Sequence, residues 1–324
     1  MATTKKKLLN DTIRRFSHLG SRTIARYLEY NYGDYWDNDL EKIRSAVRYV
    51  RGQIGNSHRD SIPDKSLFPT GDLVMPKTWR KIRTPYKLPV GLGLLLPDIH
   101  VPFHEPVPLE AAIQEGQKEK VDWILLNGDF QDCASISFWS KEKREFAKEL
   151  EATIDMLDFL VNEFPNAKFI YKPGNHEYRL PRYYAKHAPD LLESPVAAME
   201  AVIGFEERNI DFLDYYQIVY AGKLPIIHGH EMKISSPVNA ARGLYLKAKT
   251  FCLCSHFHAT SQQPTKTLDG RDLTTWSTGC LCDLSPDWNP YGNNWNWGYA
   301  IINIENNGDF EVVNRRVLPS GDVV

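Results

Sequence analysis

The sequence lacks a run of about twenty apolar residues, which is the length that an α-helix needs to cross a lipid bilayer. Its first residues, 1–7, also lack the hydrophobic centre of a secretory signal. These two absences argue against the classes of membrane protein and secreted protein. We therefore expect a soluble protein that acts in the cytoplasm and has no membrane partner.

Cysteine is also scarce, with five residues in 324, and this odd number argues against a secreted disulfide framework. Two Cys-x-Cys pairs, Cys252 with Cys254 and Cys280 with Cys282, leave open a zinc site made of four thiolates. On a strand, both thiols of such a pair share one face, here among apolar neighbours. Free cysteine is among the most buried residue types, so burial as small apolar side chains is the favoured interpretation.

Charge is distributed unevenly along the chain, although the net charge is only −2. Residues 1–88 have 18 lysines and arginines against 9 aspartates and glutamates, whereas the remainder has 21 against 32. A chain of 324 residues with 42% hydrophobic residues has the material for one large domain and a small appendage. The sequence therefore predicts a basic N-terminal domain and an acidic main domain.

The basic end has the apolar spacing of three helices, expected at 8–19, at 21–29 and from Asn38 to about Gly52. Ser21 is the expected N-cap of the second helix, and Asn38 with Glu41 resembles a capping box for the third. We place this small all-α domain at 1–60. Five prolines then fall within residues 61–89, which indicates a proline-rich basic linker.

An arginine row, Arg44, Arg48 and Arg51, follows one face of the third helix. Three small helices of this kind resemble a helix-turn-helix module, whose last helix contacts DNA. The segment 21–28 also resembles the scanning helix of such modules. The three arginines are therefore candidate DNA contacts, and the alternative is a docking domain with a solvated charged face.

From residue 90 onward, strands and helices alternate first and strands dominate later. This order predicts an α/β fold in which a two-sheet sandwich, flanked by helices, occupies 90–324. The expected helices begin near Pro106 and cover 146–164. The expected strands are 91–97, 121–127, 168–173, 215–220, 224–228, 250–257, 273–278, 298–304 and 309–317.

Five of these apolar runs end in Asp, Asn or His. In an open α/β sheet the strand ends are where ligands are held, so these side chains are expected to converge. Asp98 and His100 alternate with Ile99, so both point to the same side of the strand. The polar residues at the five ends are Asp98 and His100, Asp129, Asn175, His228, and His256 with His258.

These residues fall in the patterns D-x-H, G-D-x-x-D, G-N-H-E, H-G and H-x-H, and the ordered set resembles the calcineurin-like metallophosphoesterase superfamily. The resemblance implies two divalent ions that share a bridging carboxylate. Oxygen and imidazole ligands suit manganese first, with iron, zinc or nickel as the other candidates. The implied ligands are Asp98, His100, Asp129 and His258 for one ion, and Asp129, Asn175, His228 and His256 for the other.

Other residues receive roles near the ions. The resemblance implies that His176 lies beside the metals and protonates the leaving group, with Asp132 as the carboxylate that orients it. For Asp132, helix capping is the alternative. His104 and His230 are candidate substrate contacts, and otherwise lie in the surroundings of the ligands or on the surface.

The chain departs from the family pattern at two positions. Ser255 stands where the family normally has glycine, so its backbone must avoid conformations that only glycine adopts. Asp132 is followed by Cys133 instead of the Asp-Arg-Gly of protein Ser/Thr phosphatases, whose arginine grips the phosphate. This second departure weakens a protein-phosphatase interpretation.

Four aromatic residues follow in a stretch without strand or helix periodicity, Trp288, Tyr291, Trp295 and Trp297. They suit base stacking on a single strand, and a packed lid or subunit contact is the equal alternative.

The expected function is hydrolysis of phosphodiester bonds in nucleic acid by a metal-bridging hydroxide, with His176 as general acid. The alternatives are a phosphomonoesterase with a regulatory N-terminal domain and a protein with a vestigial metal site, and the complete ligand set argues against the latter. The combination of such an N-terminal module with this catalytic domain resembles that of proteins encoded by bacteriophages. A phage-encoded protein would act in the cytoplasm of the host cell. Oligomeric state and cleavage polarity stay open.

Overall fold

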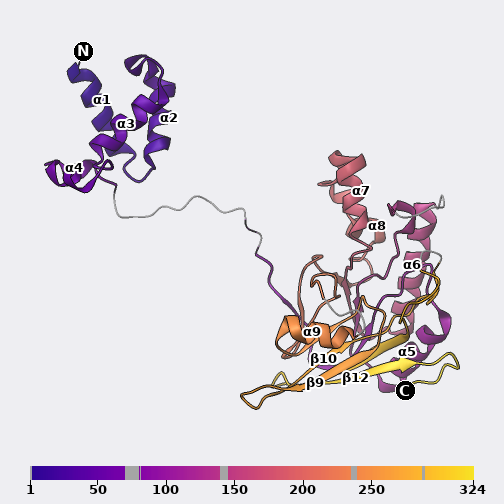
Figure 1. Cartoon of the computed structure of the whole chain (residues 1–324). Helices are drawn as coiled ribbons and strands as arrows, with labels where there is room; N and C mark the ends of the chain where they lie inside the picture. The colour runs from indigo at the N-terminus through magenta and orange to yellow at the C-terminus, as the bar shows by residue number, and fades with distance from the viewer. Residues whose placement is uncertain (1, 70–79, 81, 139–144, 235–238, 287–288) are drawn as a thin grey trace. The chain divides into compact units, whose positions relative to one another are not determined.

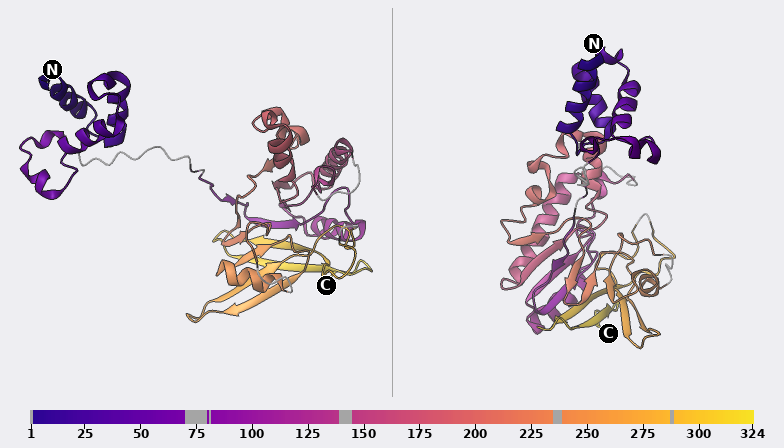
Figure 2. Two further views of the ribbon diagram at one scale, coloured as in Figure 1. Left: turned by 45° about the horizontal axis from the view of Figure 1, so that its top comes forward. Right: turned by 90° about the vertical axis from the view of Figure 1, so that its left-hand side faces the viewer.

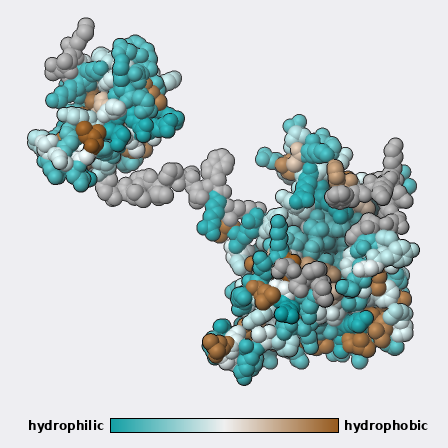
Figure 3. Space-filling view, in the orientation of Figure 1, coloured by the Kyte–Doolittle hydropathy of each residue, from teal (hydrophilic) through white to brown (hydrophobic). Residues whose placement is uncertain are grey.

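The computed structural model describes residues 2–69, 80, 82–138, 145–234, 239–286 and 289–324. The chain divides into two compact units, Met1–Lys81 and Ile82–Val324 (Figure 1). No helix among the described residues is long and apolar enough to cross a membrane. The face shown in Figure 3 is mainly hydrophilic on both units, with scattered apolar patches.

The first unit contains the three predicted helices and a fourth that was not predicted. Residues such as Ile13, Ile24 and Ile43, which are fully buried, form its core. The fourth helix has no buried residue, so its sequence lacks the apolar spacing from which a helix is predicted. The elements are α1 Ala2–Arg15, α2 Ser21–Tyr32, η1 Gly33–Trp36, α3 Leu40–Val50, α4 Asn56–Ser61 and η2 Lys65–Leu67.

Both predicted helix caps in this unit are wrong by one residue. Gly20, not Ser21, is the N-cap residue of α2, and no side chain accepts a hydrogen bond at this helix start. Asp39, not Asn38, caps α3, where its carboxylate accepts hydrogen bonds from the backbone N–H groups of Glu41 and Lys42. Asn38 has a φ of 54° instead, which is outside the extended range of an N-cap.

Arg51 does not belong to an exposed arginine row. Its side chain is only 2% exposed, and its guanidinium donates to the carbonyl oxygens of Leu19 and Ser17, both at 2.7 Å. Arg51 therefore fastens the end of α3 to the segment between α1 and α2. Arg48 is exposed and Arg44 is half-buried, so two of the three arginines stay available to a ligand.

The expected linker is shorter than 61–89. Leu67 belongs to the core of the helical unit, and Phe68 is also buried. At the other end, β1 (Tyr86–Lys87) pairs in parallel with β6 (Val219–Ala221) and so belongs to the second unit. Residues 70–79 and 81 of the expected linker lie outside the described residues.

The second unit contains two six-stranded sheets, which we call sheet I and sheet II. This architecture confirms the predicted two-sheet α/β fold. In spatial order, sheet I consists of β1, β6, β7 (Leu224–Ile226), β8 (Cys252–Cys254), β10 (Asp272–Ser277) and β9 (Ser261–Lys266). Sheet II consists of β12 (Phe310–Val317), β11 (Trp297–Ile304), β2 (Gly91–Leu96), β3 (Trp123–Asn127), β4 (Lys168–Lys172) and β5 (Ile210–Phe212).

Successive side chains of β2 point to opposite faces of sheet II, one toward the outer helices and the other toward sheet I. Leu94 and Leu96 pack in the cluster that contains the apolar faces of the outer helices, whereas Leu95 packs in the cluster between the sheets. Helices lie on the outer sides of both sheets (Figure 2). They are α5 Pro106–Glu119, α6 Phe146–Glu163 and α8 Met199–Ile203 over sheet II, and α9 Ala240–Ala248 over sheet I. One further helix, α7 Arg179–His187, follows β4.

The strands that were missed carry weak apolar signals. β9 reads Ser-Gln-Gln-Pro-Thr-Lys and lies at the edge of sheet I, where proline is tolerated because one side of the strand needs no partner. β1 is only two residues long. The turn predicted at Asn307–Gly308 is present between β11 and β12, where Asn307 Oδ1 accepts the N–H of Asp309.

Candidate metal centre

Five strand ends from the two sheets supply the polar side chains that the sequence singled out. β2, β3 and β4 are parallel neighbours in sheet II, so their carboxyl ends open at one edge. β7 and β8 are parallel neighbours in sheet I, and their ends lead into His228 and His256. The predicted convergence of five strand ends is therefore observed.

Among the described residues, possible ligand atoms form four close groups, and two of these share Asp129. The other two groups are His100 with Asp132 and His176, and His100 with His258 and Cys282. The ligand atoms of Asp98, His100 and Asp129 all lie within 4.8 Å of one another, and so do those of Asp129, His228 and His256. Asp129 belongs to both groups, with its Oδ2 3.2 Å from His228 Nε2 and 4.0 Å from His100 Nε2. A shared carboxylate between two groups is the arrangement that a pair of metal ions requires.

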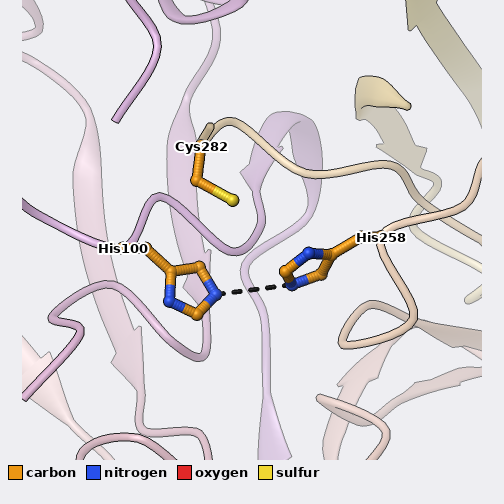
Figure 4. Close-up of side chains that lie close together, drawn as sticks. All are labelled: His100, His258 and Cys282. Atoms are coloured by element: carbon orange, nitrogen blue, oxygen red, sulfur yellow. Dashed lines mark hydrogen bonds between the residues drawn. The ribbon is translucent and has the colours of Figure 1, made fainter. Parts of the chain in front are cut away.

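His258 joins the group around Asp98. Its Nε2 is 3.2 Å from Asp98 Oδ1 and 3.4 Å from His100 Nε2. Cys282, for which burial was the favoured prediction and a four-thiolate zinc site the alternative, lies beside these two histidines (Figure 4). Burial raises the pKa of the Cys282 thiol well above its usual value, so it is a weak donor in its neutral form. All five cysteines are buried and free.

The donor set fits divalent cations. Asp98 Oδ1, Asn175 Oδ1 and His228 Nε2 are buried and make no hydrogen bond to any described residue. Leaving a buried polar atom unsatisfied costs about 1 to 3 kcal/mol, and more when it is charged. Asp98 Oδ1 and His228 Nε2 lie 4.0 Å apart, and the two unsatisfied atoms are explained if they bind a cation.

The electrostatics of the site agree with this fit for Asp129 and His256. Burial opposes ionisation of Asp129, but the charges of His176 and His228 hold the pKa of that carboxyl well below its ordinary value. Burial, together with the neighbouring His228, lowers the pKa of His256 to about 4. At neutral pH, Asp129 is therefore an anion and His256 offers a neutral imidazole, which are the forms that bind metals.

Two other candidate ligands are protonated more readily. At His228, burial opposes protonation, but the charges of Asp129 and Asp98 raise the pKa to about 9. The pKa of His258 is also raised. These two ligands therefore lose a proton when a metal binds.

Several of these residues have left-handed backbone conformations. Asp98, His100 and Asp129 have φ values of 46°, 54° and 50°, and His256 and His258 have 70° and 54°. Such conformations cost about 1 to 3 kcal/mol each and cluster at functional sites. Hydrogen bonds from His100 N to Asp129 O at 2.9 Å and from Asp98 N to Gly128 O at 3.2 Å hold the two loops in place.

The glycines of two motifs allow the close approach of ligands. A Cβ atom at Gly128 would lie 2.2 Å from His228 Nδ1, and one at Gly174 would lie 2.2 Å from Asp129 Oδ1. Both distances are far below van der Waals contact. The glycines in G-D-x-x-D and G-N-H-E are therefore needed to bring the ends of β3, β4 and β7 together.

Glu177 is a structural residue of the site that the sequence interpretation left without a role. Its fully buried carboxylate accepts the backbone N–H groups of Phe130 at 2.7 Å, Gln131 at 3.1 Å and Gly174 at 2.8 Å. It also accepts the N–H of Asp129 at 3.2 Å. Glu177 thus ties the loop after β3 to the loop after β4, and its place in G-N-H-E was the available signal.

Ser255 has a conformation that is open to any residue, as expected, because it is absent from the positive-φ positions. Its hydroxyl accepts a hydrogen bond of 2.7 Å from Asn127 Nδ2 and so connects β8 to β3. The carbonyl oxygen of Asn127 in turn lies 2.8 Å from His228 Nδ1, which leaves Nε2 directed at Asp129. Asn127, at the end of a sheet II strand, thus orients the imidazole of His228, a candidate ligand from sheet I.

His176 lies beside the two ligand groups. Its Nε2 is 3.9 Å from Asp129 Oδ2, and its Nδ1 is 2.9 Å from the carbonyl oxygen of Asp132 and 3.3 Å from Asp132 Oδ2. Asp132 Oδ2 is also 2.8 Å from His100 Nδ1. Asp132 therefore contacts a candidate ligand as well as His176, whereas the sequence predicted only the second contact.

Arg179 is a second residue that the sequence interpretation missed. Its Nη2 lies 3.0 Å from His176 Nε2, and its Nη1 donates to the carbonyl oxygen of Asp132 at 2.8 Å. The protein-phosphatase motif has an arginine directly after Asp132, where this chain has Cys133. Arg179 comes to Asp132 and His176 from the start of α7, three residues after His176.

The remaining candidates are less central. His104 and His230 belong to neither ligand group, although the His230 ring lies 5.3 Å from that of His228. The ring of Trp295 lies 4.2 Å from that of His258, and Trp297 Nε1 donates to the carbonyl oxygen of Cys282. Both tryptophans thus pack at the site. Tyr291 is 89% exposed, and Trp288 lies outside the described residues.

Comparison with known proteins agrees with this geometry. The family described as calcineurin-like phosphoesterase matches residues 94–278, a range that contains every candidate ligand. One relative, the Gene 54 protein of Mycobacterium phage L5, is 23% identical over 227 residues, which is 65% of this chain and 88% of that protein.

Three solved structures are similar at low identity. Vps29 of Chaetomium thermophilum is 15% identical with a TM-score of 0.34, and the match covers 70% of this chain and 96% of that one. Vacuolar protein sorting 29 of Cryptosporidium parvum is 12% identical with a TM-score of 0.32, covering 70% and 97%. YfcE, a phosphoesterase from E. coli, is 14% identical with a TM-score of 0.30, covering 68% and 98%.

Proposed function

This chain belongs to the calcineurin-like phosphoesterase family and is a metal-dependent phosphoesterase, and we propose that its substrates are phosphodiester bonds of nucleic acid. The observation that carries the proposal is the position of Asp129, which is common to two groups of ligand atoms, each within 4.8 Å. A binuclear centre suits the in-line displacement of phosphodiesters.

The proposed ligands are Asp98, His100, Asp129 and His258 for one ion, and Asp129, Asn175, His228 and His256 for the other. We propose manganese, with iron, zinc or nickel as the other candidates, because all of these accept imidazole and carboxylate donors. When bound, two such ions polarise phosphoryl oxygens and lower the pKa of a water molecule toward neutrality.

His176 is proposed to give a proton to the leaving oxygen as the bond between that oxygen and phosphorus breaks. The carbonyl and carboxylate of Asp132 face its Nδ1, so Nε2 is the nitrogen left for the substrate once Arg179, whose Nη2 lies 3.0 Å from it, turns to the phosphoryl group. Arg179 is proposed to bind non-bridging phosphoryl oxygens through its guanidinium, which is 23% exposed beside Nε2 of His176.

A nucleic-acid substrate is supported by the N-terminal unit. Its excess of basic residues and the arginines Arg44 and Arg48 suit a phosphate backbone. Arg44 is paired with the Glu41 carboxylate at 3.2 Å, whereas Arg48 donates only to the neutral carbonyl oxygen of Gln53 at 3.1 Å, so Arg48 is the stronger candidate contact. We propose that this helix-turn-helix-like unit delivers the catalytic unit to DNA, and the phage relative supports an action in the cytoplasm of an infected host cell.

The test compares initial rates of the full chain with manganese on four substrates. These are bis(4-nitrophenyl) phosphate, 4-nitrophenyl phosphate, single-stranded DNA and double-stranded DNA. We expect hydrolysis of the diester and of DNA, with the monoester as the poorer substrate. Preference for the monoester with no cleavage of either DNA would identify a phosphomonoesterase instead. The variant Asp129→Asn, measured in parallel, identifies activity from a contaminating enzyme.

A further inference from the structure

A continuous set of aromatic rings leads away from the metal centre. The His230 ring lies 5.3 Å from that of His228, Tyr216 lies 5.7 Å from His230, and Tyr178 lies 5.9 Å from Tyr216. These rings come from three separate segments: the loop after β7, the loop between β5 and β6, and the start of α7. The set begins at a proposed ligand and reaches the surface at Tyr216, which is 39% exposed.

Two arginines cover the outer rings. The guanidinium carbon of Arg83 lies 5.3 Å from the centre of the Tyr216 ring, and that of Arg182 lies 5.0 Å from the centre of the Tyr178 ring. Both arginines are exposed. Arg83 forms an ion pair with Asp214 at 3.8 Å, whereas among the described residues no carboxylate pairs with Arg182. The charge of Arg182 therefore stays available to an anion, and Arg83 is partly neutralised.

Packing alone accounts poorly for this arrangement. The half-buried neighbour Tyr215, whose ring is 5.1 Å from Tyr178, already supports the inner side of the cluster. Tyr216 and the two arginines add little to a core, because all three side chains are exposed, while Tyr178 is half-buried. The same combination of ring faces and positive charge is what proteins present to a single strand, where bases stack and arginines meet phosphates.

We propose that His230, Tyr216, Tyr178, Arg182 and Arg83, called here the Tyr216 strip, bind a single-stranded nucleic acid next to the phosphate that is cleaved. This proposal rests on the proposed function, because it gives the strand a path from the metal centre. A duplex is disfavoured as the ligand, since its base faces are hidden by stacking. The helix α7 contributes to both ends of the path, with Arg179 at the phosphate and Arg182 at the strip.

The experiment measures oligothymidylate as a competitive inhibitor of bis(4-nitrophenyl) phosphate hydrolysis by the manganese-loaded full chain. This inhibition constant reports binding at the active site and excludes binding to the N-terminal unit alone. The variants are Tyr216→Ala, Tyr216→Phe and the double change Arg83→Ala with Arg182→Ala. The matched control is Tyr245→Ala on α9, because the Tyr245 ring also carries a cation, Lys249 at 5.8 Å.

Loss of one base stack is worth about 1 to 3 kcal/mol, so Tyr216→Ala should raise the inhibition constant by about 5- to 150-fold. Tyr216→Phe keeps the ring and should stay within about twofold, as should Tyr245→Ala. The double arginine variant should reduce the slope of log affinity against log salt by about 1.4, the value for two phosphates of a single strand.

An inhibition constant that Tyr216→Ala leaves unchanged, or that Tyr245→Ala raises equally, would overturn the strip while leaving the proposed nuclease intact. If the wild-type chain also prefers the monoester and oligothymidylate does not inhibit it, both proposals fail. Arg182 lies exposed on a helix, so the arginine variant remains decisive if the change at Tyr216 affects folding.

Discussion

Oδ2 of Asp129 lies 3.2 Å from Nε2 of His228, and this pair joins the end of β3 in sheet II to the end of β7 in sheet I. The candidate metal centre is therefore built at the seam of the two sheets. A cation bound there would replace the direct contact between the two side chains and hold the same strand ends together. Metal content, turnover and stability are consequently linked in this protein.

Asp129→Asn should remove the shared carboxylate, because a neutral amide bridges two cations poorly. We expect metal content to fall from two ions to one or none, and turnover of the diester to fall by about 10³-fold or more, since several kcal/mol of charge stabilisation are lost. Elemental analysis and initial rates check this. Asp272→Asn, an exposed change on β10, is the matched control and should behave as wild type.

His176→Ala should separate metal binding from proton transfer. We expect a metal content near wild type and a turnover lower by about 10²- to 10⁴-fold, the range for a lost general acid. The measurement combines elemental analysis with kcat on the diester. Loss of both ions from this variant would instead make His176 a ligand, and its role as an acid would have to be abandoned.

Arg179→Lys should lower the rate although it keeps the charge, because an ammonium cannot reproduce the two-pronged contact of a guanidinium. One lost charge-assisted hydrogen bond, about 1.5 to 3 kcal/mol, predicts a decrease in kcat/KM of about 10- to 150-fold. Metal content should not change. Arg271→Lys, on the exposed β9–β10 turn, is the control, and an effect of equal size there would refute a phosphate contact at Arg179.

Glu177→Gln should destabilise the catalytic unit. The new amide turns one acceptor oxygen into a donor among four backbone N–H groups, so at least one of them loses its partner. We expect the free energy of unfolding in urea to fall by about 1.5 to 3 kcal/mol, the range for a hydrogen bond to a charged group. A variant as stable as wild type would show that the two loops are held by other contacts.

The arginines of the N-terminal unit should divide into two kinds. Arg44→Ala with Arg48→Ala should weaken DNA binding and flatten its salt dependence while leaving hydrolysis of the small diester intact. Arg51→Ala should instead lower the stability of the helical unit, because the buried guanidinium of Arg51 donates to two carbonyl groups of the segment between α1 and α2. Fluorescence anisotropy at several salt concentrations and thermal unfolding distinguish the two. An unchanged salt slope in the double variant argues against DNA docking by this face.

The catalytic fold and the convergence of its strand ends could be predicted from the sequence. The spacing of apolar residues, and the polar residues directly after each strand, can both be recognised within a short stretch of the chain. Leu94, Leu95 and Leu96 alternate between two cores, and Asp98 and His100 follow directly. The family motifs then order the strand ends. Such signals need no knowledge of distant contacts.

What was missed depends on distant contacts instead. Arg51 is buried because it donates to carbonyl groups more than thirty positions earlier in the chain. The spacing of residues within α3 alone gives no sign of these distant partners. Arg179 reaches His176 only because α7 begins directly after the G-N-H-E loop. β9 is a polar edge strand whose partner, β10, gives it its conformation. Tertiary context decided each of these cases.

The most direct test of the metal centre is a crystal structure of the chain grown with abundant manganese, with anomalous scattering used to locate the ions. The account predicts two peaks about 3.5 to 4 Å apart, bridged by the carboxylate of Asp129, with His256 on one ion and His100 on the other. A single peak, no peak, or ions that Asp129 does not contact would contradict it.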